Sequence, residues 1–169
     1  SALIKELVLR KEEFKDEVVQ TIYFGGGTPS VLDTAEIDLI IGAVYSNYTV
    51  VADPEITLEA NPDDLSLDKI MELARSPINR LSIGIQSFFG EDLKMMNRAH
   101  NAKEAEDCIG LAKKYFDNIS IDLIYGIPGM TNERWISNIE KALDFGVPHI
   151  SSYALTVEPK TALKTFIEK

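Results

Sequence analysis

The 169 residues of the chain are 45% hydrophobic and 26% charged, a composition typical of one globular domain with a substantial core. A formal net charge of −10 argues against a nucleic-acid-binding surface, which needs a basic stripe, and no apolar run approaches the roughly 18 residues that span a bilayer. The single cysteine, Cys108, excludes an internal disulfide and any site built from several cysteines of this chain, and it fits a cytoplasmic protein.

Both ends of the sequence have the pattern of an interrupted element. The sequence starts without an initiator methionine, and apolar residues recur at helical spacing from Leu3 and Leu7 to Phe14. Residues 161–169 begin another amphipathic segment. We therefore expect the chain to be a piece of a longer protein.

Strands and helices are expected to alternate five times along the chain. The expected strands are 21–24, 55–62, 80–88, 118–125 and 149–157, and Pro54 marks the break before the second. Helices are expected after caps at Asp33 or Thr34 and at Ser66, and then over 91–96, 103–116 and around 135–143. This order predicts an α/β fold with a parallel sheet. Because an eightfold barrel needs about 250 residues, the chain forms either a partial barrel or an open doubly wound sheet.

Side-chain alternation favours the partial barrel. Aliphatic residues occupy positions 81, 83 and 85, whereas the alternate positions hold Ser82, Gly84 and Gln86. In the fourth strand, Ser120 and Asp122 likewise share the face opposite the aliphatic residues. A strand between two helix layers is apolar on both faces. One small and polar face instead predicts a wide lumen around a polar ligand.

Polar groups also gather at the carboxyl ends of the expected strands, where parallel α/β folds place their sites. They are the glycine turn 25–27, Glu59, Gln86, Asp122 and Tyr153. Glycine permits a positive φ and leaves the backbone bare, so amides can approach a ligand closely. This set suits a ligand with ammonium, hydroxyl and carboxylate groups, such as an amino acid joined to a nucleoside. We expect the side chains of Glu59, Gln86 and Asp122 to point into one concave space, with strand 21–24 at an exposed sheet edge.

The run Phe24-Gly25-Gly26-Gly27-Thr28-Pro29-Ser30 resembles the S-adenosylmethionine (SAM) glycine motif of radical SAM enzymes. Segments 58–62, 81–88 and 122–129 are similar to oxygen-independent coproporphyrinogen III oxidase and to its paralogue, the heme chaperone. Ser87, Pro128-Gly129 and segment 152–159 are more similar to the chaperone branch. The resemblance covers nearly the whole chain. It implies a truncated radical SAM core domain over residues 1–169, with about five βα units of a partial parallel barrel.

The resemblance also implies which residues contact SAM. Gly26, Gly27 and Thr28 would hold its methionyl part, and Glu59 would bind SAM as well. Further contacts, to SAM or to a second SAM molecule as in the oxidase, would come from Gln86, Arg98, Asp122 and Ala154. No catalytic residue and no metal ligand is assigned.

The chain departs from the family in one decisive respect. It lacks the CxxxCxxC motif that holds a [4Fe–4S] cluster, and it also lacks the family's C-terminal accessory region. The cluster is therefore expected only in the intact parent protein, and the chain alone is predicted to be inactive. The resemblance implies that the parent decarboxylates coproporphyrinogen III to protoporphyrinogen IX or binds and transfers heme. Its partners would be SAM, porphyrinogen or heme, and an electron donor or a heme-receiving protein.

Plainer interpretations of the same residues remain open. Glu59 and Asp122 are also consistent with structural ion pairs, and Arg98 with a solvated surface side chain. A glycine-rich βα turn also occurs in nucleotide-dependent oxidoreductases of open α/β fold, although this turn lacks the spacing of G-x-G-x-x-G. A binding module without chemistry is the other alternative. His100, His149 and Cys108 are interpreted as structural, since the sequence places no further ligands beside them at metal-site spacing.

Overall fold

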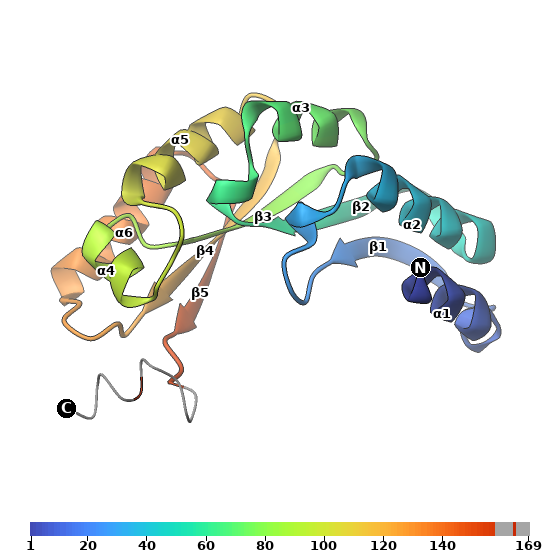
Figure 1. Ribbon diagram of the computed structural model, residues 1–169, viewed down its shortest axis with the longest axis horizontal. Helices are drawn as coiled ribbons and strands as arrows, with labels where there is room; N and C mark the ends of the chain where they lie inside the picture. The colour runs from blue at the N-terminus through green and yellow to red at the C-terminus, as the bar shows by residue number, and fades with distance from the viewer. Residues whose placement is uncertain (158–163, 165–169) are drawn as a thin grey trace.

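A computed structural model describes residues 1–157 and 164. It contains one sheet of five strands: β1 (Val18–Phe24), β2 (Thr49–Ala60), β3 (Arg80–Gln86), β4 (Asn118–Tyr125) and β5 (His149–Ala154). The strands lie in chain order, and each neighbouring pair is parallel. The sheet curls into an arch with helices along its outer side (Figure 1). The expected partial barrel of βα units is therefore confirmed, and the open doubly wound sheet is wrong.

The helices are α1 (Ala2–Arg10), α2 (Thr34–Asn47), α3 (Leu67–Arg75), α4 (Gly90–Met95), α5 (Ala102–Ala112) and α6 (Asn132–Asp144). Short 3₁₀ turns cover Lys11–Phe14, Pro29–Val31 and Pro62–Asp64. Polar caps fix several helix starts: the Ser66 hydroxyl accepts the Lys69 amide at 3.2 Å, and the Asn101 side chain accepts the Glu104 amide at 3.1 Å. The Ser66 cap is the one expected from the sequence.

Some element boundaries differ from the expected ones. β2 begins at Thr49, so Pro54 lies inside the strand instead of before it. The β1–β2 register shifts between Val19 and Thr21, in the stretch opposite Pro54, and this irregularity accommodates a residue that has no amide hydrogen to donate. β3 and β5 end earlier than expected, at Gln86 and Ala154.

The helix expected after a cap at Asp33 or Thr34 is confirmed, with Asp33 as its N-cap. A 3₁₀ turn comes first, and α2 starts at Thr34, where the Asp33 amide donates to the Glu36 carboxylate at 3.3 Å. The amphipathic segment expected over residues 161–169 lies outside the described residues, apart from residue 164.

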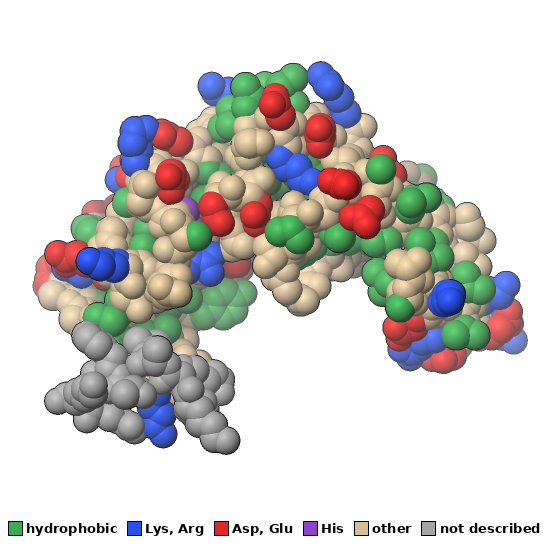
Figure 2. Space-filling model, in the orientation of Figure 1, with side chains coloured by type: hydrophobic (Ala, Val, Ile, Leu, Met, Phe, Trp, Pro, Cys, Tyr) green, Lys and Arg blue, Asp and Glu red, His purple; other side chains and the backbone are tan. Residues whose placement is uncertain are grey.

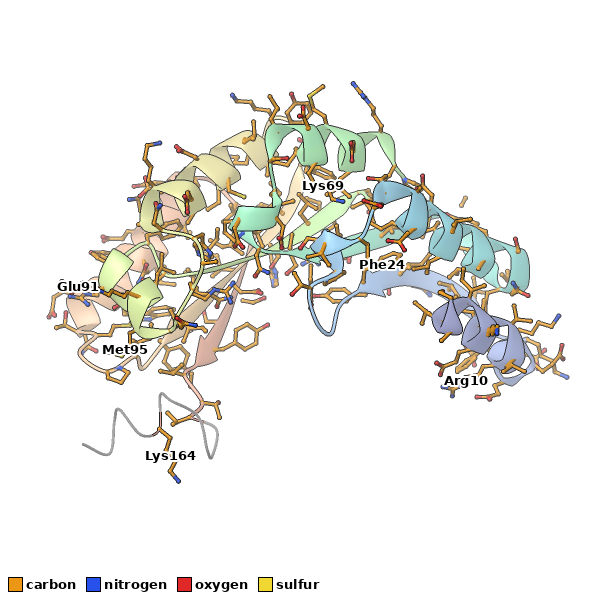
Figure 3. The ribbon with its side chains drawn as sticks, viewed as in Figure 1. Arg10, Phe24, Lys69, Glu91, Met95 and Lys164 are labelled. Carbon is orange, nitrogen blue, oxygen red and sulfur yellow. The ribbon has the colours of Figure 1, made fainter. Side chains whose placement is uncertain are left out.

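The hydrophobic core lies between the outer face of the sheet and the helices. Its strand side chains are the aliphatic residues of the expected alternation, and they are almost fully buried: Leu58, Leu81, Ile83, Ile119 and Ile121. Phe24 extends the core between the end of β1 and α2 (Figure 3). Because the aliphatic side chains point outward to the helices, the small and polar ones face the inside of the arch.

The open edge of the sheet agrees with expectation. Among the described strands, β1 pairs with β2 alone, so it is the exposed edge strand that the sequence predicts. Acidic and basic side chains are interspersed on the face shown in Figure 2, which carries no basic stripe. No helix among the described residues has both the length and the hydropathy of a membrane span.

Candidate cofactor-binding site

A polar cavity of about 230 Å³ lies inside the arch at the carboxyl edge of the strands. Its lining is Gly27, Thr28, Pro29, Glu59, Ala60, Asn61, Ser82, Gly84, Gln86, Arg98 and Asp122. Six of the eight residues that the resemblance assigns to SAM are in this lining. Residues up to 95 positions apart, from Gly27 to Asp122, therefore meet in one space, as the alternation of the strands predicts.

The glycine turn after β1 reaches the cavity through its backbone. Gly26 and Gly27 have φ values of +77° and +140°, a region that favours glycine. The Gly26 amide donates to Oε2 of Glu59 at 3.2 Å, whereas Gly27 and Thr28 line the cavity directly. Gly26 thus contributes to the site by holding the Glu59 carboxylate and does not line the cavity itself.

Glu59 occupies the penultimate position of β2 and is half-buried. Its Oε1 accepts the Tyr23 hydroxyl at 2.8 Å, and its Oε2 accepts the Gly26 amide. The interpretation of Glu59 as a partner in a structural ion pair finds no support, because no basic side chain lies within ion-pair distance of it among the described residues. Its contacts are hydrogen bonds from β1 and from the turn.

Gln86 ends β3 with a φ of +68°, a conformation that is uncommon outside glycine. The β3–β4 register shifts between Ile83 and Gln86. A buried network holds the next two residues: the Ser87 hydroxyl donates to Asp92 at 2.7 Å, and the Phe88 amide donates to Asn138 at 2.7 Å. The strained backbone therefore turns the Gln86 side chain into the cavity against a fixed support.

Arg98 joins the site from the segment between α4 and α5. Its guanidinium donates to Oδ1 of Asn61 at 2.6 Å and lies 3.4 Å from the Gly84 carbonyl oxygen. Its Nε is buried and has no hydrogen-bond partner within the described chain. This partnership with Asn61 makes Arg98 part of the cavity wall rather than a solvated surface side chain.

Asp122 lies on the inner face of β4, opposite Ser151 of β5. Burial and the nearby charge of Glu59 raise the pKa of Asp122, and a hydrogen bond from Ser151 and the charges of Arg80 and His149 oppose the shift. Two carboxylates in one cavity favour a ligand that brings a positive charge or hydrogen-bond donors.

The sequence did not identify Asn61, Ser82 or Gly84 as site residues. Ser82 and Gly84 follow from the alternation of β3 once Gln86 is assigned to the lumen. Asn61 has a weaker signal: it directly follows β2 and precedes Pro62. Ala154 does not reach the cavity, since it lies exposed at the end of β5, paired with Tyr125.

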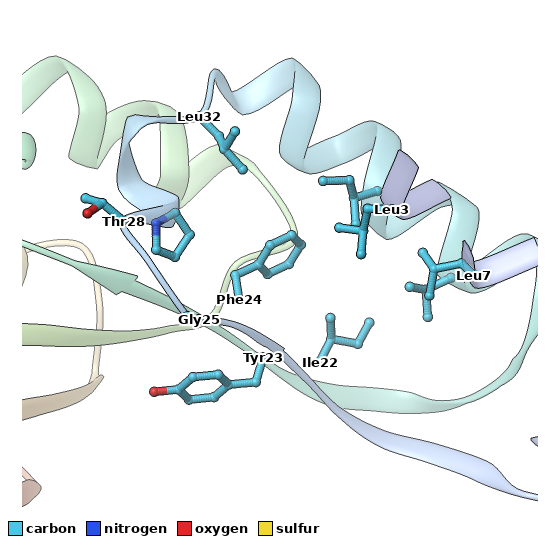
Figure 4. Close-up of a pocket in the computed structure, with 12 residues that line it drawn as sticks. Leu3, Leu7, Ile22, Tyr23, Phe24, Gly25, Thr28 and Leu32 are labelled. Carbon is cyan, nitrogen blue, oxygen red and sulfur yellow. The ribbon is translucent and has the colours of Figure 1, made fainter. Parts of the chain in front are cut away.

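A second, apolar groove of about 440 Å³ lies on the other side of β1, between α1 and α2 (Figure 4). Leu3, Leu7, Ile22, Phe24 and Leu32 are among the residues that line it. Gly26 belongs to this lining as well. The groove is larger than the polar cavity, but it lacks the charged side chains that would orient a ligand such as SAM.

The residues of this chain do not fit an iron–sulfur cluster. Such clusters take several cysteine thiolates, and the single Cys108 is buried on α5 with its pKa raised to about 12 by burial. The described residues contain no group of three His, Cys, Asp or Glu side chains that could hold a metal ion. His100 contacts the Ile85 carbonyl at 3.1 Å and His149 contacts the Ser120 hydroxyl at 2.7 Å, which supports their structural interpretation.

The chain is similar in sequence to curated proteins and in fold to a solved structure. The heme chaperone HemW of Lactococcus lactis is 40% identical over 161 residues, which cover 95% of this chain and 42% of that protein. HemW of Escherichia coli is 38% identical over 144 residues, covering 85% of this chain and 38% of that protein. The structure of coproporphyrinogen III oxidase (HemN) from Escherichia coli superimposes with a TM-score of 0.82 at 30% identity, over 94% of this chain and 37% of that one.

The chain thus spans less than half of the length of each of these proteins. Residues 2–142, most of the sequence, match the family described as the Radical SAM superfamily. This chain belongs to the Radical SAM superfamily.

Proposed function

We propose that residues 1–169 belong to the SAM-binding core domain of a radical SAM protein of the heme-chaperone type. The observation that carries the proposal is the convergence of Gly27, Thr28, Glu59, Gln86, Arg98 and Asp122 on one polar cavity. These are positions that the family resemblance assigns to SAM, and they come from three strands and two connecting segments. Membership of the superfamily and the curated HemW relatives support the same conclusion.

The donor set suits the parts of SAM. The backbone amides of Gly27 and Thr28 and the Glu59 carboxylate suit an amino-acid moiety, because amides recognise carboxylates and a carboxylate recognises an ammonium group. Gln86 and Asp122 offer acceptors for hydroxyl groups, and Arg98 adds a positive charge to the wall. When bound, SAM supplies radical chemistry that requires an electron of low potential. The residues of this chain would position the cofactor and would not donate that electron.

Titration calorimetry of the chain with SAM tests the proposal. We expect saturable but weak binding, with a dissociation constant of about 0.1–1 mM, because no cluster iron anchors the ligand here. Glu59→Gln should weaken binding at least tenfold, since it removes a charge that faces the ligand. Glu140→Gln on the exposed face of α6 is the matched control and should leave affinity unchanged.

Two results would contradict SAM binding. One is the absence of saturable binding up to about 10 mM SAM. The other is equal affinity of the Glu59→Gln variant and the unaltered chain. NAD is the comparison ligand, and preferential NAD binding would instead favour a nucleotide-dependent oxidoreductase.

For the intact parent we propose heme binding and transfer in the cytoplasm, with heme and a heme-receiving protein as partners. The curated heme-chaperone relatives favour this activity. The structural likeness to coproporphyrinogen III oxidase favours the second candidate, the oxidative decarboxylation of coproporphyrinogen III with a [4Fe–4S] cluster and an electron donor. Heme titration followed by its Soret band, beside an anaerobic assay for protoporphyrinogen IX, distinguishes the two. Product formation without heme binding would overturn the chaperone proposal.

A further inference from the structure

Tyr23 lies beside the candidate SAM site, although it does not line the polar cavity. Its neighbours Ile22 and Phe24 point into the apolar groove, which Tyr23 also borders, whereas the Tyr23 ring extends toward the opposite side of β1 (Figure 4). There its hydroxyl donates a hydrogen bond of 2.8 Å to Oε1 of Glu59. An edge-strand side chain thus reaches across to the carboxylate of the next strand.

The second oxygen of Glu59 is held by the same segment of chain. The Gly26 amide, three residues after Tyr23, donates to Oε2 at 3.2 Å. One carboxylate therefore ties the end of β1 and the glycine turn to β2. An ionised carboxylate accepts about four hydrogen bonds, so Glu59 keeps acceptor capacity for a ligand after making these two.

The three glycines of the turn differ in how a side chain at each position would affect the Tyr23–Glu59 hydrogen bond. A Cβ on Gly25 would lie 2.7 Å from Cε1 of Tyr23 and 2.9 Å from Oε1 of Glu59. A Cβ on Gly26 or Gly27 would meet nothing within 4 Å, but both residues have a positive φ. Gly25 is therefore needed to make room for the Tyr23–Glu59 hydrogen bond, whereas Gly26 and Gly27 are needed for the path of the backbone.

We propose that Tyr23 is a positioning residue of the SAM site: its hydroxyl fixes the Glu59 carboxylate and, through it, the glycine turn. This inference rests on the proposed function. Burial and the hydrogen bond to Glu59 raise the pKa of Tyr23, so its hydroxyl keeps its proton and acts as a donor at neutral pH.

The Tyr23→Phe variant removes the hydroxyl and keeps the ring. We expect its SAM dissociation constant to rise about five- to tenfold, because Glu59 loses one of its two fixed contacts. Tyr115→Phe is the matched control: Tyr115 follows α5, near the amino end of β4 and away from the cavity, and its variant should bind SAM as the unaltered chain does. Thermal unfolding of both variants separates a change in affinity from a loss of folded protein.

A spectroscopic measurement tests the hydrogen bond without any ligand. In protein labelled with ¹³Cζ-tyrosine, the resonance that disappears in Tyr23→Phe belongs to Tyr23. We expect it to titrate above the ordinary pKa of tyrosine, and to titrate lower in Glu59→Gln, which lacks the negative charge. Because a loss of burial would also lower this titration, thermal unfolding must show that Glu59→Gln keeps its fold.

The outcomes separate this inference from the proposed function. If Tyr23→Phe binds SAM as tightly as the unaltered chain while Glu59→Gln loses binding, the role of Tyr23 is overturned and SAM binding stands. If the unaltered chain does not bind SAM, both the proposed function and the positioning role of Tyr23 are overturned. The tyrosine titration then reports only on the Tyr23–Glu59 hydrogen bond. A Tyr23 titration that Glu59→Gln leaves unchanged also overturns the inference.

Discussion

The glycine turn shows that three identical residues in a row have different physical reasons to be glycine. Gly25 has its place because a side chain would collide with Tyr23 and Glu59, and Gly26 because its backbone has a φ of +77°. The sequence identified the turn as a whole, but it did not show that Gly25 and Gly26 are glycine for different reasons. The reason for Gly25 is a contact between Tyr23 and Glu59, which are 36 positions apart in sequence.

A set of alanine substitutions tests these two reasons. Gly25→Ala should lower the free energy of unfolding by about 1–3 kcal/mol through overpacking, and Gly26→Ala by about 1–2 kcal/mol through backbone strain. Gly42→Ala is the control: its site inside α2 is open, so it should raise stability by about 0.5–1 kcal/mol through helix propensity. Denaturant unfolding measures all three. Equal stability of Gly25→Ala and the unaltered chain would show that Tyr23 or Glu59 moves aside without cost.

Asp122 gives a prediction in which stability and binding change in opposite directions. Because its pKa is raised in the folded chain, the folded state binds its proton more tightly than the unfolded state does. The free energy of unfolding therefore falls as the pH rises from the ordinary pKa of aspartate through the raised pKa of Asp122. It does not recover at neutral pH, where the buried carboxyl is ionised. Asp122→Asn should consequently be more stable than the unaltered chain at pH 7.

The same variant should bind SAM about tenfold more weakly, since it loses a charged acceptor. Unfolding experiments between pH 3 and pH 7 check the stability of the variant, and calorimetry checks its affinity. The stability difference should vanish below the ordinary aspartate pKa of about 3.9, where the carboxyl is neutral in both states. A variant that is less stable at pH 7 would indicate that Asp122 stabilises the fold through its partners.

At the scale of elements, the exit of β3 depends on helices far along the chain. Asn138 of α6 is fully buried, and its side chain accepts the Phe88 amide and bonds the Ser87 hydroxyl. Asp92 of α4 is 1% exposed and pairs with Arg134 at 3.0 Å. Figure 3 shows the neighbouring Glu91 at this end of the molecule, where it also pairs with Arg134 at 2.9 Å. These contacts fix the backbone directly after Gln86.

Asn138→Ala should lower the free energy of unfolding by about 2–3 kcal/mol, because it leaves the buried Phe88 amide without its acceptor and removes a hydrogen bond to the Ser87 hydroxyl, which keeps only Asp92 and the Phe89 amide. We also expect weaker SAM binding, since the strained Gln86 loses its support. The neighbouring Ser137→Ala, on the exposed face of α6, should change stability by less than about 0.5 kcal/mol. Denaturant unfolding of the two variants makes the comparison. A loss of less than 1 kcal/mol in Asn138→Ala would mean that water replaces the amide.

The elements themselves were largely predictable, because their signals are local. Alternating aliphatic residues in β3 and β4 and the cap at Ser66 are read directly from sequence neighbours. The misplaced start of β2 has the opposite cause: a proline normally ends a strand, and only the shifted register with β1 makes Pro54 acceptable. The Ser87–Asp92–Asn138 network joins residues up to 51 positions apart, so no local sequence pattern could predict it.

At the scale of the whole molecule, the arch explains why the site was predictable as a set. In a parallel sheet ordered along the chain, the residues before each carboxyl end necessarily meet at one edge. Curvature then brings the inward-facing ones together, which places Glu59, Gln86 and Asp122 in one cavity. Of the eight assigned residues, Ala154 at the far edge strand and Gly26 in the turn lie outside the lining of this cavity. The order of the strands could not predict that Arg98 lines the cavity, because Arg98 lies in a connecting segment.

The last prediction concerns chemistry by the chain as a whole: residues 1–169 alone catalyse no cleavage of SAM. Reductive cleavage requires an electron of low potential, which iron–sulfur clusters held by several thiolates supply. The chain contains one thiol, and burial raises its pKa to about 12, so it is not a thiolate at neutral pH. The carboxylates, amide and guanidinium of the cavity position a ligand but provide no electron at such a potential.

The test is to incubate the purified chain anaerobically with iron, sulfide, dithionite and SAM, and to assay 5′-deoxyadenosine by chromatography. We expect neither a cluster absorption band bound to the protein nor product above a blank without protein. The intact parent protein, treated identically, is the positive control and should yield both. A cluster spectrum together with 5′-deoxyadenosine from the chain alone would show that its own residues assemble a redox centre, contrary to the argument from Cys108.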